Sequence, residues 1–523
     1  MTKYVAIIGA GIAGLTAIKQ CLDNDLIPIC FEQNSFIGGL WRYENCEKNK
    51  EPYSTIYKGV LTNTSKEMST FSDFPIPAEW PSYLNQTYVE KYIDMYAENF
   101  NLLPHIKFNT TVLKISILPD KRWKVKYIIQ NKNQEKEEIF DYIMVCSGHH
   151  TKPKWPEFKG MNFFKGEQLH SYKYKRAIDF ENKRVLVVGG SFSAMDIAVE
   201  LSNVASQVYI SIRSGKLPWI IPRFMNGKAT DHFTRFDDYI IPLSIKGKFL
   251  ENFIIKSFPT PSYVKLPTDP LISSPIIINS VIFQCLAAGT IIVKPNIKEL
   301  KSENNQIEFI DGSFLENIDV IIYSTGYSFN YPFLEKNIYT GGDEIEQVYG
   351  KDFHDIVWLY NSIFPPKYPN IAFIGLTNRA GSLLPICFNL QSEMQARYAT
   401  SLFKGSIKPL PSQNEMEISI RKYYEDVRKM YCKSARSGIR YNYLSYMDAL
   451  SKEVGCYPHP YEIFKKFGFN FWKLFMFGMA TPIQYRLIGR GSWEGAKDAI
   501  SLYNEYSLKN STRGSREMVV LKN

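Results

Sequence analysis

The sequence of 523 residues lacks the patterns that mark several classes of protein. None of its eight cysteines forms a Cys-x-x-Cys pair, so no structural zinc, redox dithiol or other metal site is predicted. No apolar run reaches the roughly 18 residues of a membrane-spanning helix, and the nearest candidate, 275–293, is interrupted by polar side chains. The first residues lack the basic, apolar and small-residue regions of a signal peptide. We therefore expect reduced cysteines and a cytoplasmic location.

The charge distribution argues against a nucleic-acid-binding protein. Lys and Arg number 62 against 52 Asp and Glu, which gives a net charge of +10, but the basic residues are dispersed and form no basic arm. Nucleic acid is therefore not expected as a partner. An anionic cofactor or anionic lipid headgroups are compatible with the excess charge. The aromatic-rich run 467–479 leaves open a peripheral contact with a membrane surface, and a homodimer is also left open.

The first informative feature present is a glycine-rich turn near the start of the sequence. An apolar strand enters Gly9-x-Gly11-x-x-Gly14, and a helix-compatible run follows. In a dinucleotide-binding turn these glycines allow the tight turn, the approach of a pyrophosphate and close packing of helix on strand. The helix would also present free N–H groups to the phosphates. We predict cofactor contacts from Gly9, Ala10, Gly11, Ile12, Ala13 and Gly14.

The chain after this turn indicates which dinucleotide is bound. The second strand ends in Glu32, whose carboxylate can accept hydrogen bonds from both ribose hydroxyls and would repel a 2′-phosphate. This favours FAD or NAD over NADP. The sequence then reads Gly38-Gly39-Leu40-Trp41, and paired glycines before a bulky aromatic suit backbone beside a flavin. We therefore predict FAD, with contacts from Glu32, Gly39, Leu40 and Trp41.

A second glycine turn lies within residues 184–198. Its frame is Gly189-x-Ser191-x-x-Ala194, in which Ser191 replaces the middle glycine and offers a hydroxyl to a phosphate oxygen. The next strand ends in Ser211 and Arg213 rather than in a carboxylate. A guanidinium suits a 2′-phosphate, so NADPH is predicted over NADH. The predicted NADPH-binding residues are Gly189, Ser191, Ser193, Ala194, Met195, Asp196 and Arg213.

The segment between the two turns resembles a known family. Residues 164–174 match the Phe-x-Gly-x-x-x-His-x-x-x-(Tyr/Phe) motif of the flavin-containing monooxygenases, with His170 and Tyr174 at its last two positions. Baeyer–Villiger relatives usually carry Trp where this sequence has Tyr174. Other stretches are similar to animal-type members of these class B flavoprotein monooxygenases, in the same order: 62–68, 71–75, 146–150, 324–327 and 481–487.

The resemblance implies FAD and NADPH as cofactors, with O2 and a small-molecule nucleophile as substrates. The implied reaction is N- or S-oxygenation of amines and thioethers through a flavin C4a-hydroperoxide, with Asn63 as the catalytic residue. The resemblance also implies a role in xenobiotic metabolism. It implies the cytosolic face of the endoplasmic reticulum membrane as an alternative location to the cytoplasm. His170 is expected to order the linker rather than to transfer a proton. Further cofactor contacts are implied for Thr62, Asn63, Thr64, Val112, Thr325, Gly326, Tyr327 and Gln395.

Three alternatives stay open: a Baeyer–Villiger monooxygenase acting on ketones, an uncoupled NADPH oxidase, and a non-catalytic dinucleotide-binding protein. The fold expected in each case is α/β, with two Rossmann-like three-layer domains and an irregular, mostly helical insertion. Within the first domain, the polar run 131–138 is expected to be a hairpin tip. The expected segments are 1–155 and 331–450 for FAD, 156–213 and 294–330 for NADPH, 214–293 for the insertion and 451–523 for a C-terminal helical segment.

Overall fold

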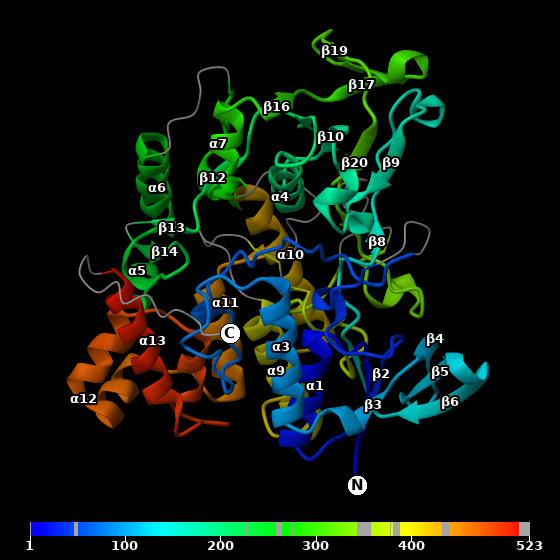
Figure 1. Cartoon of the computed structure of the whole chain (residues 1–523). Coiled ribbons are helices and arrows are strands. Elements are labelled where there is room, and N and C mark those ends of the chain that lie inside the picture. The colour runs from blue at the N-terminus through cyan, green and yellow to red at the C-terminus, as the bar shows by residue number, and fades with distance from the viewer. Residues whose placement is uncertain are drawn as a thin grey trace.

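Two parallel five-stranded sheets organise the chain, as seen in a computed structural model (Figure 1). The structure describes residues 2–45, 51–225, 227–257, 264–274, 276–342, 357–376, 378–379, 388–430 and 440–511. Each sheet is covered by helices on one face and by a small antiparallel sheet on the other, which makes two three-layer domains. The predicted fold class is confirmed.

The first sheet has the order β22-β7-β1-β2-β3. Its strands are β1 (Tyr4–Ile8), β2 (Ile27–Phe31), β3 (Ile106–Lys107), β7 (Tyr142–Val145) and β22 (Ile371–Phe373). Side chains of β1 alternate between faces, as the two-residue period of a strand requires. Val5 and Ile7 pack on helices α1 (Ile12–Asp23) and α9 (Phe388–Lys404), whereas Ala6 and Ile8 pack on β4 (Thr110–Ile117) and β5 (Trp123–Ile129).

The second sheet repeats this plan with the order β16-β11-β10-β20-β9. Its strands are β9 (Glu167–His170), β10 (Arg184–Val188), β11 (Gln207–Ser211), β16 (Ile291–Lys294) and β20 (Val320–Tyr323). Val185 and Val187 pack on helix α4 (Phe192–Leu201). Leu186 and Val188 face the small sheet formed by β17 (Ile297–Lys301), β18 (Gln306–Phe309) and β19 (Phe314–Leu315).

The hairpin expected at 131–138 is wrong in extent. The turn is confined to residues 130–133, and β6 (Gln134–Phe140) is a regular strand paired with β5. Two cross-strand ion pairs hold it, Lys124–Glu137 at 3.2 Å and Lys126–Glu135 at 2.6 Å. Because β6 is an exposed edge strand, its charged side chains hide the alternation that identifies a half-buried strand.

The insertion combines short strands with helices. It contains β12 (Trp219–Ile221), β13 (Phe224–Met225), β14 (Lys228–Ala229), α5 (Arg235–Ile240), α6 (Leu243–Ser257), β15 (Ile276–Ile278) and α7 (Ile282–Ala287). The chain then returns to the second sheet at Ile291, where β16 pairs with β11. None of the helices in the described ranges has the length and apolar character needed to cross a bilayer.

The C-terminal part packs beside the first domain and the insertion (Figure 1). Its main helices are α10 (Gln413–Met430), α11 (Tyr443–Val454), α12 (Pro460–Phe477) and α13 (Ala496–Ser511). Arg235 of α5 is fully buried and donates to Asp448 at 3.1 Å and Gln484 at 2.5 Å. The remaining elements are α2 (Lys66–Ser69), α3 (Gln86–Asn99), β8 (Lys152–Pro153), β21 (Tyr327–Ser328), β23 (Asn378–Arg379) and β24 (Arg440–Tyr441).

Candidate active site

The first glycine turn can adopt its tight geometry only because its key positions lack side chains. Gly9 has φ +100°, and a β-carbon there would lie 2.9 Å from the carbonyl oxygen of Cys146. A β-carbon on Gly14 would overlap the carbonyl oxygen of Gly9, so only glycine lets α1 pack this closely on the turn. Gly11 is the N-cap residue of α1, and the first N–H groups of the helix receive no side-chain cap. These groups fit an anionic ligand.

The Gly38-Gly39 turn lies directly against this first turn. The Gly38 N–H donates to the Ala10 carbonyl oxygen at 3.0 Å. A β-carbon on Gly39 would lie 3.1 Å from the Cα of Gly11. Trp41 packs against the hydrophobic cores of both domains. The paired glycines therefore place backbone beside the first turn, as a flavin site requires.

Glu32 lies at the end of β2 and is buried. Its Oε2 accepts a hydrogen bond from the Ala10 N–H at 2.7 Å, and its Oε1 accepts from both N–H groups of Asn34 at 2.9 Å. Burial raises the pKa of Glu32, although these donors oppose the shift. The carboxylate is thus fixed beside the turn, at the position predicted for ribose recognition.

The second turn has the same geometry with one difference. Gly189 has φ +143°, and a β-carbon there would lie 2.5 Å from the carbonyl oxygen of Ser324. Ser191 is the N-cap residue of α4, is exposed, and makes no capping hydrogen bond with its side chain. The Ser191 hydroxyl therefore does not cap the helix, and it suits hydrogen bonding to a phosphate.

The other residues predicted for the second nucleotide divide into two groups. Ser193 and Arg213 are exposed, and Arg213 lies two residues beyond the end of β11. Ala194 and Met195 are fully buried and pack α4 on its sheet. Ser211, which we associated with Arg213, donates its hydroxyl hydrogen to the Pro295 carbonyl at 2.7 Å and is not directed to a ligand.

The loop that carries Asn63 is held from both sides. The Thr62 hydroxyl accepts from the Leu84 N–H at 2.9 Å, and the Thr64 hydroxyl lies 2.7 Å from that of Ser69. Asn63 itself is only half-buried. The loop backbone is therefore rigid while the Asn63 amide stays accessible.

Two residues of the insertion contact this loop, and the sequence analysis did not predict either of them. Arg223 Nη2 lies 3.5 Å from Asn63 Oδ1, and Arg223 Nε donates to the Thr62 carbonyl at 3.4 Å. Asp231 is fully buried and accepts from the Ser65 N–H at 2.7 Å. Neither residue belongs to a motif, because the contacts join positions that are 160 and 166 residues apart.

Asp196 links the same region to the second domain. Its carboxylate accepts from Asn279 Nδ2 at 2.9 Å and from the Tyr57 hydroxyl at 3.4 Å. Burial raises the pKa of Asp196, and the positive charge of Arg223 opposes the shift. Arg223 therefore acts electrostatically on both Asn63 and Asp196, one from each predicted nucleotide site.

The linker motif is held to the segment that follows β20 through His170. Its ring is fully buried, Nε2 lies 3.0 Å from the Gly326 carbonyl, and Nδ1 accepts from the Tyr172 N–H at 3.4 Å. Burial lowers the pKa of His170 to about 4. The imidazole is therefore neutral near pH 7. This geometry agrees with an ordering role rather than proton transfer.

The remaining predicted residues support the first turn from behind. Gln395 is fully buried, accepts from the Gly375 N–H at 2.8 Å and donates to the Tyr446 hydroxyl at 2.8 Å. A β-carbon on Gly375 would lie 3.3 Å from the β-carbon of Ala13. Gln395 thus fixes backbone that touches α1 instead of facing a ligand itself. Val112 packs on the core beneath the first sheet.

Thr325 and Tyr327 flank Gly326 at the crossing between the domains. The Thr325 hydroxyl donates to the Lys154 carbonyl at 2.5 Å, and Tyr327 pairs with Pro153 of β8. The Tyr327 ring lies 5.2 Å from that of His170. These residues hold the chain segments that connect the two sheets.

Glu200 provides a titratable contact between helix α4 and Tyr174 of the linker motif. Its Oε2 accepts from the Tyr174 hydroxyl at 2.7 Å, while its Oε1 is buried and makes no hydrogen bond within the described residues. Burial raises the pKa of Glu200 to about 7. Folding therefore favours the protonated form, and the stability that this provides is lost as pH rises from about 4 to about 7.

Glu200→Gln should remove this pH dependence. We expect the thermal midpoint of the variant to rise relative to the unchanged protein as pH increases from about 5 to about 8, because only the carboxyl group becomes charged. Calorimetry across this range measures the difference. A gap that stays constant with pH would contradict the assignment, and Glu181→Gln serves as the control at an exposed position.

Two glycine turns of this kind, joined through a buried linker, define a flavoprotein class with separate FAD and NAD(P)H domains. A family model described as flavin-binding monooxygenase-like matches residues 2–519. The chain is 39% identical to flavin-containing monooxygenase 5 of Cavia porcellus, over 95% of this chain and 91% of that protein. It is 38% identical to N-oxide-forming dimethylaniline monooxygenase 2 of Rattus norvegicus, over 97% and 93%.

Solved structures agree on the fold. S-allyl-L-cysteine S-oxygenase from Allium sativum matches with a TM-score of 0.65 at 23% identity, over 97% of this chain and 99% of that one. Cyclohexanone monooxygenase in its open form matches with a TM-score of 0.61 at 16% identity, over 86% and 97%. The chain belongs to the flavin-containing monooxygenase family, as its motifs predicted, and its cofactors are FAD and NADPH.

Proposed function

We propose that the protein consumes NADPH and O2 to place one oxygen atom on a soft nitrogen or sulfur of a small molecule. The other oxygen atom leaves as water, and NADPH leaves as NADP⁺. The observation that carries this proposal is the contact of Arg223 with the Asn63 loop, beside an electrostatic link to Asp196 of the second nucleotide domain. It supports a site in which both nucleotides meet at Asn63.

Each group in this site has a distinct role in the proposal. FAD, when bound, supplies the redox and oxygen-activating chemistry. The glycines of the first turn and Glu32 hold it, and Ser191 and Arg213 hold NADPH. Asn63 offers an amide that donates and accepts where the two cofactors meet. His170 fixes the linker, and no dedicated catalytic acid or base is required.

The reaction is tested by supplying NADPH and oxygen with an amine, a thioether and a ketone. Formation of N-oxide or sulfoxide in proportion to NADPH supports the proposal. Esters from the ketone would identify a Baeyer–Villiger enzyme instead, and hydrogen peroxide without oxygenated product would identify an oxidase. If the purified protein lacked the yellow absorbance of flavin, a non-catalytic dinucleotide-binding protein would be the remaining interpretation.

Arg213→Ser tests the choice of nicotinamide cofactor. We expect the KM for NADPH to rise by about tenfold or more while the KM for NADH changes little, because only the 2′-phosphate needs the guanidinium. Steady-state kinetics with both cofactors gives the two values. Equal effects on both would overturn the assignment. Arg122→Ser, at an exposed arginine of the β4–β5 turn, is the matched control.

We also propose a peripheral contact with the cytosolic surface of the endoplasmic reticulum membrane. Helix α12 exposes four aromatic side chains beside the exposed Lys465 and Lys473, which suits an anionic bilayer surface. The neighbouring helix α5 packs on it, with the Phe236 and Phe477 rings 4.7 Å apart. The exposed aromatics of α12 are Tyr461, Phe464, Phe469 and Phe477.

Phe469→Ser should weaken binding to vesicles that contain anionic phospholipid by about tenfold, since one exposed phenylalanine loses its burial in the interface. Vesicle flotation measures the bound fraction. Phe163, which is 74% exposed in the second domain, provides the matched control Phe163→Ser. Unchanged flotation in the first variant, or an equal loss in both, would contradict the proposal.

A further inference from the structure

The short hairpin of the insertion lies against the loop that carries Asn63. Its strands β13 and β14 pair antiparallel, so the residues that flank them lie close together. On one flank Arg223 Nε donates to the Thr62 carbonyl at 3.4 Å, and on the other Asp231 Oδ2 accepts from the Ser65 N–H at 2.7 Å. The hairpin therefore contacts the loop backbone immediately before Asn63 and two residues after it.

The first domain holds the same loop at its two ends by backbone hydrogen bonds of 2.8 Å. These bonds join the N–H groups of Thr62 and Lys66 to the carbonyl oxygens of Leu84 and Ser82. Between the two ends, the Ser65 N–H donates to the carboxylate of Asp231. A side chain of the insertion thus supports the short stretch of backbone that carries Asn63.

Asp231 is suited to this task because its own position is fixed. Its side chain is fully buried, and its backbone carbonyl accepts from the Phe233 N–H at 2.9 Å. The Phe233 carbonyl accepts from the Ala480 N–H at 3.0 Å, and Arg235 forms its buried ion pair with Asp448 at 3.1 Å. The chain that follows Asp231 is therefore fastened to the C-terminal part.

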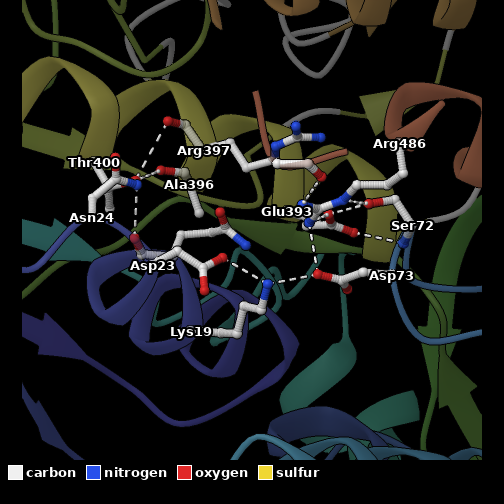
Figure 2. Close-up of polar contacts among 12 residues, drawn as sticks. Lys19, Asp23, Asn24, Ser72, Asp73, Glu393, Ala396, Arg397, Thr400 and Arg486 are labelled. Carbon is white, nitrogen blue, oxygen red and sulfur yellow. Dashed lines mark hydrogen bonds and ion pairs between the residues drawn. The ribbon is translucent and has the colours of Figure 1, made fainter. Parts of the chain in front are cut away.

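The C-terminal part is fastened in turn to the first domain, a few residues beyond the loop (Figure 2). Arg486 Nε donates to the Ser72 hydroxyl at 2.6 Å, and Arg486 Nη2 lies 2.7 Å from Asp73 Oδ2 and from Glu393 Oε1. Arg486 is buried, so solvent ions screen these pairs little. The three parts are thus joined to one another, and Asp231 is held at a fixed place relative to the loop.

The charge of Asp231 is balanced within its own cluster. His232 Nε2 and Lys66 Nζ each lie 3.5 Å from a carboxylate oxygen of the buried Glu67. With His232 protonated, two positive charges accompany the carboxylates of Glu67 and Asp231. Burial raises the pKa of Asp231 to about 6, so the group is ionised at neutral pH. A charged acceptor holds the Ser65 N–H more strongly than a neutral one does.

We propose that Asp231 is a positioning residue that fixes the Asn63 amide for the oxygenation reaction. Because its side chain is fully buried, it acts through the Ser65 backbone and does not contact the substrate. The inference rests on the proposed function, within which it assigns a role. Without this acceptor the loop loses its support on one side of Asn63. NADPH, O2 and a proton are then expected to give NADP⁺ and hydrogen peroxide in place of oxygenated product.

Two substitutions of Asp231 test this role, with thioanisole as substrate and the FAD-containing enzyme. Asp231→Leu removes the acceptor, so we expect product per NADPH consumed to fall by about tenfold with flavin content unchanged. Asp231→Asn keeps an oxygen that can accept from the same N–H and should restore the yield. Asp319, whose carboxylate accepts the Arg184 N–H at 2.8 Å, gives the matched control Asp319→Leu. A normal yield from Asp231→Leu, or an equal loss in the control, would overturn the proposal.

Ser65→Pro removes the same hydrogen bond from the donor side. Ser65 has φ −63°, which the proline ring adopts without strain. We expect the yield per NADPH to fall as it does in Asp231→Leu. This variant also decides the question if Asp231→Leu does not fold. A normal yield from Ser65→Pro would show that the contact does not position Asn63.

Combining Asp231→Leu with Asn63→Leu separates positioning from general support of the fold. If Asp231 acts through Asn63, the double variant forms as much product as Asn63→Leu alone, whereas independent effects multiply. A further loss in the double variant would therefore refute the positioning role.

Hydrogen exchange of residues 61–69 gives a readout that does not depend on activity. Exchange in the FAD-containing protein should be faster in Asp231→Leu than in the unchanged protein, and close to normal in Asp231→Asn. Equal exchange in all three would contradict the inference. Absence of oxygenated product from the unchanged protein would refute the proposed function. Product from the unchanged protein, with a normal yield from Asp231→Leu, would refute this inference alone.

Discussion

Asn63→Leu is expected to retain bound FAD and to lose oxygenated product by about a hundredfold or more, the usual cost of removing a hydrogen-bonding group from the reacting centre. Leucine has nearly the size of asparagine but neither donates nor accepts. The loop around it is held by Thr62, Thr64 and Ser65 through contacts that the substitution leaves intact. The defect should therefore be chemical rather than structural.

The measurements for this variant are flavin absorbance, NADPH consumption and product yield. Flavin content and thermal midpoint should stay close to those of the unchanged protein, while NADPH consumed without product appears as hydrogen peroxide. Asn203→Leu, at an exposed turn after α4, should behave normally in all three. Full product yield from the Asn63 variant would remove this residue from the reaction.

Gly14→Ala should have the largest effect on structure. Its β-carbon would overlap the carbonyl oxygen of Gly9, so α1 must move away from the turn. Overpacking of this kind costs about 1–3 kcal/mol, and sometimes more. We expect both a lower free energy of unfolding and a protein largely free of FAD, because the same shift displaces the N–H groups at the start of the helix.

Gly11→Ala provides the contrast on the same turn. A β-carbon there meets its nearest atom, the Gly39 Cα, at an ordinary 3.6 Å. The protein stripped of FAD should therefore unfold at the same denaturant concentration as the unchanged protein, while its affinity for FAD falls. If Gly11→Ala leaves the affinity for FAD unchanged, the pyrophosphate does not occupy the predicted position.

The parts of this molecule that the sequence predicted are those encoded within short stretches. Both glycine turns combine a strand, a turn and a helix start within about 15 residues, so residue spacing alone indicates the geometry. Glu32 follows from the same local plan. The linker motif around His170 was predicted in the same way, because all of its residues lie at fixed spacings within the single segment 164–174.

The parts that the sequence did not predict depend on contacts between distant segments. Arg223 and Asp231 approach the Asn63 loop only after the insertion folds onto the first domain. The ion pairs of Arg486 with Asp73 and Glu393 form only when the C-terminal part meets the first domain. In α10, Ile418 is 58% exposed while Ile420 is buried, because neighbouring elements decide which face of the helix is covered.

The insertion is fastened at two points that lie twelve residues apart. Arg223 contacts the Asn63 loop, and Arg235 is buried against Asp448 and Gln484 in the C-terminal part. One short span thus ties the Asn63 loop, where we propose that oxygenation occurs, to the C-terminal part that carries α12. Amino-acid changes that adapt this span to a new substrate or surface also shift Asn63, so the range of compounds accepted and the waste of NADPH are expected to evolve together.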